Sequence, residues 1–348
     1  MTNTDIRLLI VDDSKIMRDA IADMFTYGTN INVVATAANG AEAIDAINEH
    51  KPDVVTMDVS MPVMDGMSAL KHIMIENPIP TVMLSSLTLE GARVAFDALR
   101  FGAIDFISKP SSVQDTDLSD QEAEIRGKIE YAAEVEVNAI KYIRETNAVH
   151  PVADDLNTQQ PERIISIGAA EGGYGALLKI IPYLQSDLPY SYLVTLYAAR
   201  EHVDAFASYL NHYSSVHVKR AAHDDVLKPG VCYINSGMDY MTVHAQDDNY
   251  NLHVSQAPFA TRKGAIDMLM FSTVEVMGDK CVGVILSGMG RDGSEGLEEI
   301  LHRGGDGVLQ DPVTCLCKNM VNSAMSVNEL SNVIADNKIA GFINAINK

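Results

Sequence analysis

The sequence predicts an α/β protein with two domains, each built around a mostly parallel sheet. Short apolar strands alternate with helical patterns through the first 110 residues, and a similar alternation resumes near residue 162. A polar, acidic stretch separates the two regions. Alternating strands and helices favour parallel sheets with helices on both faces. With 348 residues, the chain is long enough for two domains that each bury a core.

The first region contains five apolar segments that we expect to form strands. Helical patterns such as 13–25 and 40–50 lie between them. Ligands of such sheets bind at the carboxyl ends of the strands. The five expected strands are 7–13, 31–37, 53–59, 81–87 and 103–110.

The stretch 111–160 differs in composition, with eleven acidic and four basic side chains. Its part 121–145 has the spacing of a helix with one apolar face. The polar, proline-containing stretch 150–162 indicates a linker. We therefore predict domains at 1–110 and 161–348, joined by an acidic helix and linker at 111–160. The apolar positions of the helix are Ile125, Ile129, Ala132, Ile140 and Ile143.

The second region again alternates strands and helices. A helical pattern covers 264–277, and another follows Asp292. We expect a β-hairpin near 231–256, which makes this domain a parallel α/β sheet with a hairpin added. The expected strands are 163–169, 192–197, 231–235, 240–245, 251–256 and 281–288.

Composition excludes several classes of function. Lys and Arg number 26 against 47 Asp and Glu, a net charge of −21, which argues against nucleic-acid binding. No apolar run approaches 18 residues, so we expect no membrane insertion. The first residues lack the basic and apolar parts of a signal peptide, and the four cysteines form no disulfide framework. A cytoplasmic location is expected.

Carboxylates cluster at strand ends in the first region. Asp12 and Asp13 follow the first strand, and Asp58 ends the third. Parallel strands bring these ends together, and oxygen ligands of this kind suit Mg²⁺. Ser85 and Lys109 end the fourth and fifth strands. A metal ion, an ammonium and a hydroxyl can together stabilise a phosphoryl group on a carboxylate.

These residues and the loop "DVSMPVMDG" resemble the receiver domain of two-component response regulators, a flavodoxin-like (βα)5 fold. The resemblance covers residues 5–110. It implies that a histidine kinase phosphorylates Asp58 and that Mg²⁺ is held by Asp12, Asp13, Asp58 and the backbone carbonyl of Ser60. It also implies that Ser85 and Phe106 form the switch pair and that Lys109 senses the phosphate.

A second motif is the glycine-rich turn in "IGAAEGGYGA", residues 167–176. An apolar strand enters the turn and a helical pattern leaves it, which is where α/β hydrolases place a nucleophile. Ala170 and Glu171 occupy the turn. An alanine methyl group has no nucleophilic atom.

The glycine turn and "LSGMGRDG" at 286–293 resemble the chemotaxis receptor methylesterases, response regulators that demethylate receptor glutamates and deamidate glutamines. The resemblance extends over essentially the whole chain and implies a doubly wound C-terminal domain. That family uses a Ser-His-Asp triad. By position, Ala170 replaces the serine, Tyr197 replaces the histidine and Asp292 is retained, while Glu171 alters the cleft.

Two hypotheses follow from this resemblance. A phenol titrates near ~10, so Tyr197 is a poor base near neutral pH, and the main interpretation is a pseudoenzyme. Such a protein would act by binding chemoreceptors, a kinase complex or another regulator under control of Asp58. The alternative is an active methylesterase/deamidase that uses non-standard residues. Candidate nucleophiles and bases for that alternative are Ser166, Ser287, Cys315, Cys317 and His202.

Two details of the altered cleft complete the expectations. Asp292 is expected to cap the helix that follows it or to bind a turn amide. Arg200 and Arg291 lie on facing loops and are candidate ionic partners of Glu171.

Overall fold

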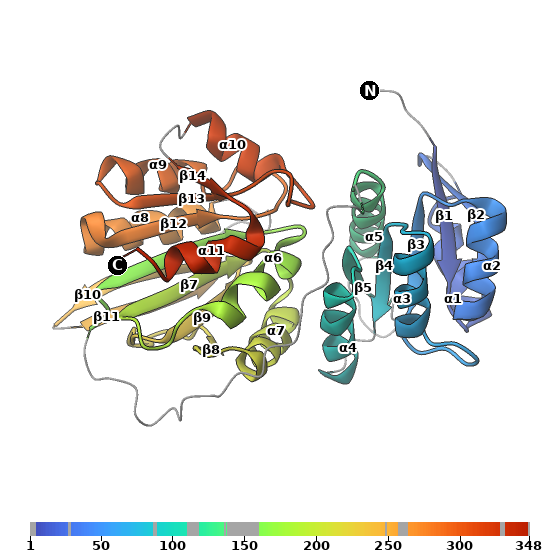
Figure 1. Ribbon diagram of the computed structural model, residues 1–348, viewed down its shortest axis with the longest axis horizontal. Coiled ribbons are helices and arrows are strands. Elements are labelled where there is room, and N and C mark those ends of the chain that lie inside the picture. The colour runs from blue at the N-terminus through green and yellow to red at the C-terminus, as the bar shows by residue number, and fades with distance from the viewer. Residues whose placement is uncertain are drawn as a thin grey trace. The chain divides into compact units, whose positions relative to one another are not determined.

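The structure is a computed structural model that describes residues 5–26, 29–85, 89–109, 118–135, 137, 160–247, 249–256, 264–327 and 331–346. It divides into two compact units, Met1–Ile143 and Arg144–Lys348 (Figure 1). Most of 111–160 lies outside the described residues, so the predicted boundaries at 110 and 160 stay a prediction.

The first unit is a five-stranded parallel sheet in the order β2-β1-β3-β4-β5. This is the flavodoxin-like order expected from the sequence, with its switch point between β1 and β3. Helices cover both faces of the sheet (Figure 1). The strands are β1 (Ile6–Val11), β2 (Ile31–Ala37), β3 (Val54–Asp58), β4 (Thr81–Ser85) and β5 (Asp105–Ser108); the helices are α1 (Lys15–Asp23), α2 (Gly40–His50), α3 (Gly66–Glu76), α4 (Leu89–Arg100) and α5 (Leu118–Ala133).

Local sequence signals explain where these elements begin and end. β3 and β4 are buried along their whole length, as expected for central strands covered on both faces. The side chain of Asn39 caps α2 and that of Asp65 caps α3, each by accepting backbone N–H groups of the first turn. In α5, Ile125, Ile129 and Ala132 are buried as predicted, whereas Ile140 and Ile143 lie outside the described residues.

The loop after β3 contains a strained residue. Val63 has φ of 67° and is 88% exposed. A left-handed conformation is unfavourable for a β-branched residue, while asparagine tolerates it. We expect Val63→Asn to raise the free energy of unfolding of the first unit by about 1 kcal/mol, measured by urea denaturation. The control is Val313→Asn, because Val313 is similarly exposed but is not among the residues with positive φ. Equal effects of the two substitutions would contradict the assignment of strain.

The second unit is a seven-stranded parallel sheet in the order β14-β13-β12-β6-β7-β9-β8, with a separate hairpin of β10 and β11. Its switch point lies between β6 and β12. The strands are β6 (Arg163–Ala169), β7 (Tyr190–Leu196), β8 (His217–Arg220), β9 (Val231–Ser236), β10 (Asp239–Gln246), β11 (Asn249–Gln256), β12 (Cys281–Ile285), β13 (Asp306–Gln310) and β14 (Asn332–Ile334).

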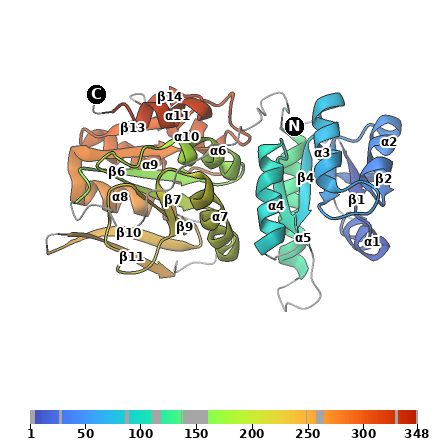
Figure 2. The same ribbon diagram turned by 60° about the horizontal axis from the view of Figure 1, so that its bottom comes forward.

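Helices enclose this sheet on both faces. α8, α9 and α10 lie on one face, while α6, α7 and α11 lie on the other (Figure 1). The hairpin packs against α8 through β10 (Figure 2). The helices are α6 (Gly173–Ile180), α7 (Arg200–Tyr213), α8 (Ala265–Met277), α9 (Ser294–His302), α10 (Asn319–Val327) and α11 (Asp336–Ile343), with short 3-10 turns η3 (Ile181–Tyr183) and η4 (Gly278–Lys280).

The structure differs from the sequence-based expectation in its short strands. β8, β13 and β14 were not predicted, because each has only three to five residues and mixes polar with apolar side chains. The segment 231–236 joins the parallel sheet as β9, so the predicted hairpin is confined to 239–256. Among the described residues, no helix is long and apolar enough to cross a membrane.

Candidate functional site

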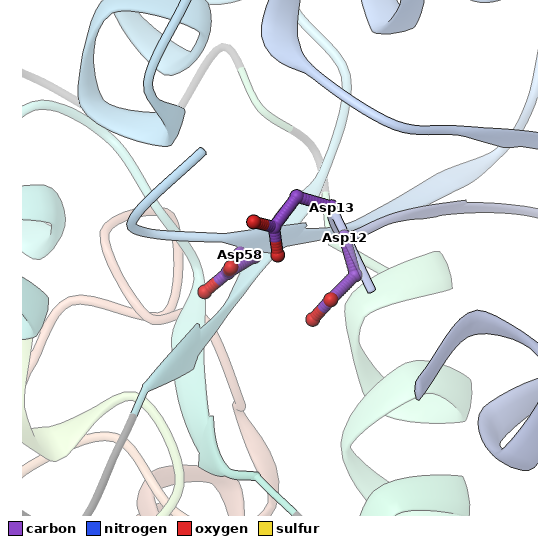
Figure 3. A group of neighbouring side chains, drawn as sticks. All are labelled: Asp12, Asp13 and Asp58. Carbon is purple, nitrogen blue, oxygen red and sulfur yellow. The ribbon is translucent and has the colours of Figure 1, made fainter. Parts of the chain in front are cut away.

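The first candidate site is the acidic cluster at the switch point of the first sheet. Asp12 follows β1 and Asp58 ends β3, and carboxylate oxygens of Asp12, Asp13 and Asp58 lie within 4.8 Å of one another (Figure 3). Lys109, just after β5, places its Nζ 2.8 Å from Asp58 Oδ2 and 2.9 Å from Asp12 Oδ2. The predicted acidic residues and lysine therefore come together in one site.

The charges of this cluster are incompletely balanced. Three carboxylates and one ammonium leave a formal charge of −2, and Asp12 and Asp58 are almost entirely buried. Burial raises the pKa of Asp58, while Lys109 opposes this by hydrogen bonding and by its charge. Burial acts to lower the pKa of Lys109, but its contacts with Asp58 and Asp12 prevail and raise it. An all-oxygen donor set with an excess charge of −2 fits a divalent cation of the Mg²⁺ type.

The loop after β3 is packed tightly around Asp58. A Cβ on Gly66 would lie 2.0 Å from the carbonyl oxygen of Asp58, so only glycine fits there. The backbone of Ser60 hydrogen-bonds the Asp58 carboxylate. A hollow of about 500 Å³ adjoins this loop and is lined by Val59, Ser60, Met61, Asp65, Met67 and Val94.

The predicted switch residues Ser85 and Phe106 lie on the neighbouring strands β4 and β5. Ser85 is buried at the end of β4, and its carbonyl accepts the N–H of Lys109 at 2.8 Å. Phe106 on β5 is buried and packs edge-to-face on Phe96, with ring centroids 5.5 Å apart. Their role as a switch pair is not tested by these positions.

The second candidate site lies at the switch point of the second sheet, where β6 enters the glycine turn. Ala170 donates its N–H to the carbonyl of Ser287 at 3.0 Å and is 4% exposed. Gly172 has φ of 78° and is the N-cap of α6, which begins at Gly173. The N–H of Gly173 donates to the carbonyl of Ala170 at 2.8 Å, and the other first-turn N–H groups have no partner within the helix. A Cβ on Gly288 would lie 2.6 Å from that of Ala170, so the turn and the β12 loop are in close contact.

Glu171 links these two loops. Its Oε2 accepts the N–H of Met289 at 2.9 Å, and its carbonyl accepts the hydroxyl proton of Ser287 at 2.8 Å. The two arginines predicted to pair with Glu171 contact other carboxylates. Arg200 binds Asp239 through two hydrogen bonds, and Arg291 lies 3.6 Å from Glu295. Spacing along the chain could not reveal the Met289 contact, because it joins residues 118 positions apart.

Tyr197 and Asp292, at two positions equivalent to triad residues, are in direct contact. The Tyr197 hydroxyl donates to Asp292 Oδ2 at 2.5 Å and accepts the N–H of Ala265 at 3.3 Å. Asp292 also accepts the N–H groups of Ile266 and Asp267, at 2.9 and 3.0 Å. Asp292 therefore caps the start of α8, instead of the helix that follows it or a turn amide as predicted.

Asp267 completes a reciprocal arrangement. It lies in the first turn of α8, and its carboxylate accepts the N–H of Gly296 in the first turn of α9 at 2.7 Å. Asp292 thus caps α8, the helix that contains Asp267, and Asp267 caps α9, the helix that follows Asp292. Burial, with the nearby charge of Asp292, raises the pKa of Asp267 to about 7. The sequence did not reveal this role, because the contact joins residues 29 positions apart.

This pKa makes stability depend on pH. Between about pH 4 and 7, folded Asp267 holds a proton that the unfolded chain has lost, so the free energy of unfolding falls as pH rises through that window. Asp267→Asn keeps an acceptor for Gly296 and removes the titration. We expect the variant to be more stable than the native protein at pH 8 by on the order of 1–3 kcal/mol, with little difference at pH 4. Urea denaturation at both pH values measures this; an equal difference at both would contradict it.

The serines and cysteines considered as alternative nucleophiles are buried or hydrogen-bonded within the fold. Ser166 hydrogen-bonds Thr273 inside the core, and Ser287 bridges the carbonyls of Glu171 and Cys317. The Cys315 thiol is buried, which raises its pKa and disfavours the thiolate. Cys317 is also buried, and its Sγ contacts Asn319.

Together, an acidic cluster at the switch point of a five-stranded parallel sheet and a second parallel α/β unit are typical of a response regulator. The family model "CheB methylesterase" matches residues 165–343, and "Response regulator receiver domain" matches residues 8–118. The chain belongs to the CheB methylesterase family.

Relatives and a solved structure agree with this membership. The protein-glutamate methylesterase/protein-glutamine glutaminase of Pyrococcus abyssi is 35% identical over 346 residues, covering 97% of this chain and 93% of that protein. The protein of the same name from Archaeoglobus fulgidus is 36% identical over 330 residues, covering 94% of each. The CheB methylesterase catalytic domain of Thermotoga maritima matches with a TM-score of 0.50 and 27% identity, covering 52% of this chain and 97% of that domain.

These comparisons overturn one expectation. The interpretation of the chain as a pseudoenzyme is wrong, because relatives 33–36% identical over nearly its full length are named as enzymes. The error came from treating the missing serine and histidine as decisive. A hydrolytic site can also use a carboxylate to activate water, and such a mechanism needs neither a serine nor a histidine.

Proposed function

We propose that the chain is a phosphorylation-controlled hydrolase that removes methyl esters from glutamate side chains, and ammonia from glutamines, of chemoreceptor proteins. Support comes from relatives of that name which match it along almost its whole length. The proposed catalytic mechanism rests on the Glu171 carboxylate, which the N–H of Met289 positions beside the glycine turn.

In the proposed reaction, water is the nucleophile and Glu171 is the general base. Glu171 takes a proton as the water oxygen adds to the ester carbonyl carbon. The oxyanion forms near the first-turn N–H groups of α6, which favour negative charge. When the intermediate collapses, the bond to the methoxyl oxygen breaks and Glu171 returns its proton to that oxygen. Methanol and a glutamic acid side chain are released, and the acid then loses its proton to solvent.

Tyr197 and Asp292 have a positioning role in this scheme. Asp292 is committed to the hydroxyl of Tyr197 and to two amides of α8, which leaves it little capacity as a base. Tyr197 also donates its backbone N–H to the carbonyl of Ala169, the last residue of β6. The pair thus holds the start of α8 against the turn that carries Ala170 and Glu171.

The proposed input is phosphorylation of Asp58 by a histidine kinase. Asp12, Asp13, Asp58 and the carbonyl of Ser60 would hold Mg²⁺, which neutralises phosphoryl charge when bound. Lys109 already contacts two of these carboxylates and would contact the phosphoryl group. The four cysteines are buried free thiols, which suits a reducing compartment such as the cytoplasm.

Peptide mass spectrometry tests the proposal. Methylated chemoreceptor membranes are incubated with the full chain, Mg²⁺ and a small acyl phosphate, and receptor peptides are then analysed. We expect glutamyl methyl esters to become free glutamates, faster with the phosphodonor than without it. Peptides identical to those of a sample without protein, despite phosphorylated Asp58, would contradict the proposal.

A further inference from the structure

Three histidines of the second unit lie side by side on its surface. His223 follows β8, His244 is on β10 and His253 is on β11. The ring centroid of His253 lies 4.4 Å from that of His223 and 5.7 Å from that of His244. His253 and His244 are exposed, and the His223 side chain is 50% exposed. Neither the proposed reaction nor the receiver site uses these side chains.

Backbone hydrogen bonds hold the histidine-bearing segments together. Asp224 donates its N–H to the carbonyl of Leu252 at 2.9 Å, and Leu252 donates to the carbonyl of Asp225 at 2.8 Å. Each bond joins a neighbour of His223 to a neighbour of His253. The antiparallel pairing of β10 and β11 places Thr242 opposite His253, so the backbone of His244 is also held near His253. The backbone segments that carry the three imidazoles are therefore held near one another before any ligand arrives, which lowers the entropic cost of binding.

Two of the rings also have partners of the kind that orient metal-binding histidines. His244 Nε2 lies 2.9 Å from Thr242 Oγ1, and His223 Nε2 lies 3.5 Å from the carboxylate of Asp224. When these oxygens accept the Nε2 proton, the lone pair of each ring is on Nδ1 and is available to a metal ion. Outer oxygen acceptors of this type fix the tautomer and raise the basicity of ligating imidazoles.

We propose that His223, His244 and His253 form a binding site for a divalent transition-metal ion, with Zn²⁺ as the ion to test. Imidazole nitrogens suit Zn²⁺, Cu²⁺ and Ni²⁺, whereas Mg²⁺ prefers oxygen. Ring nitrogens of the three residues do not all lie within 4.8 Å of one another, so binding requires the exposed rings to rotate. Exposed rings reorient rapidly, and a water can fill the fourth position. A bound ion would link the loop after β8 to the hairpin of β10 and β11.

Isothermal titration with ZnCl₂ tests the site on the untagged full chain, with excess Mg²⁺ present to occupy oxygen ligands. We expect one Zn²⁺ per chain at this site, and His253→Ala to weaken binding by at least about tenfold. His302→Ala, which alters an exposed histidine of α9, should bind like the native chain. His253→Gln serves as a second variant that keeps a polar side chain of similar size.

Thermal unfolding provides an independent readout. Zn²⁺ should raise the midpoint of the native chain and of His302→Ala, but not that of His253→Ala, because only proteins that bind the ion when folded are stabilised. Zn²⁺ binding of equal strength and stoichiometry in the native chain and both His253 variants would overturn the proposal. So would the absence of binding to the native chain.

Discussion

Replacing Glu171 by glutamine is expected to lower kcat/KM for ester hydrolysis by about 10²–10⁴-fold. Glutamine can still accept the N–H of Met289, so the turn keeps its geometry, but it cannot take a proton from water. The measurement is the initial rate of methanol release from methylated receptor membranes. Glu295→Gln is the control, because Glu295 is an exposed glutamate of α9 that pairs with Arg291. A Glu171→Gln variant with the native rate would contradict the role of Glu171.

A second comparison separates Glu171 from a triad mechanism. Ala170→Ser combined with Tyr197→His restores the residue types of the family's triad. In that background a serine can attack directly, so the loss caused by Glu171→Gln should be smaller than in the native chain. Equal losses in the two backgrounds would indicate that Glu171 acts on the structure of the turn.

Asp58→Asn is expected to abolish phosphorylation and, with it, the stimulation of hydrolysis by a phosphodonor. The substitution removes the phosphoacceptor oxygen that Lys109 contacts at 2.8 Å. Phosphate-affinity electrophoresis and methanol release are measured on the same samples. Asp45→Asn, at an exposed position on α2, should behave as the native protein does. If the phosphodonor still stimulates hydrolysis by Asp58→Asn, phosphorylation of Asp58 is not what controls the reaction.

The sequence was sufficient to predict the acidic site because parallel sheets have simple geometry. Asp12, Asp58 and Lys109 each follow or end a strand, and the strand order brings those ends together. The second switch point was equally accessible, since the glycine turn follows β6 and "LSGMGRDG" follows β12. Both site predictions require only the positions of the strand ends, and the ends of apolar segments in the sequence indicate these positions well.

The remaining features depend on contacts between distant segments. Glu171 meets Met289, Asp292 caps α8 and Asp267 caps α9, and none of these pairs has a characteristic spacing. The histidine group arises only when the loop after β8 folds onto the hairpin, which apolar periodicity cannot indicate. The arginine partners predicted for Glu171 were wrong for the same reason, because Met289 approaches it from a distant segment.

Methanol release by the unmodified chain is the most direct test of the central claim. The chain, with Asp58 phosphorylation measured in the same tubes, is compared with a sample without protein and with Glu171→Gln. The account predicts release clearly above the blank from the native chain, and release reduced by about 10²–10⁴-fold in the variant. Release at the level of the blank, with Asp58 fully phosphorylated, would contradict it.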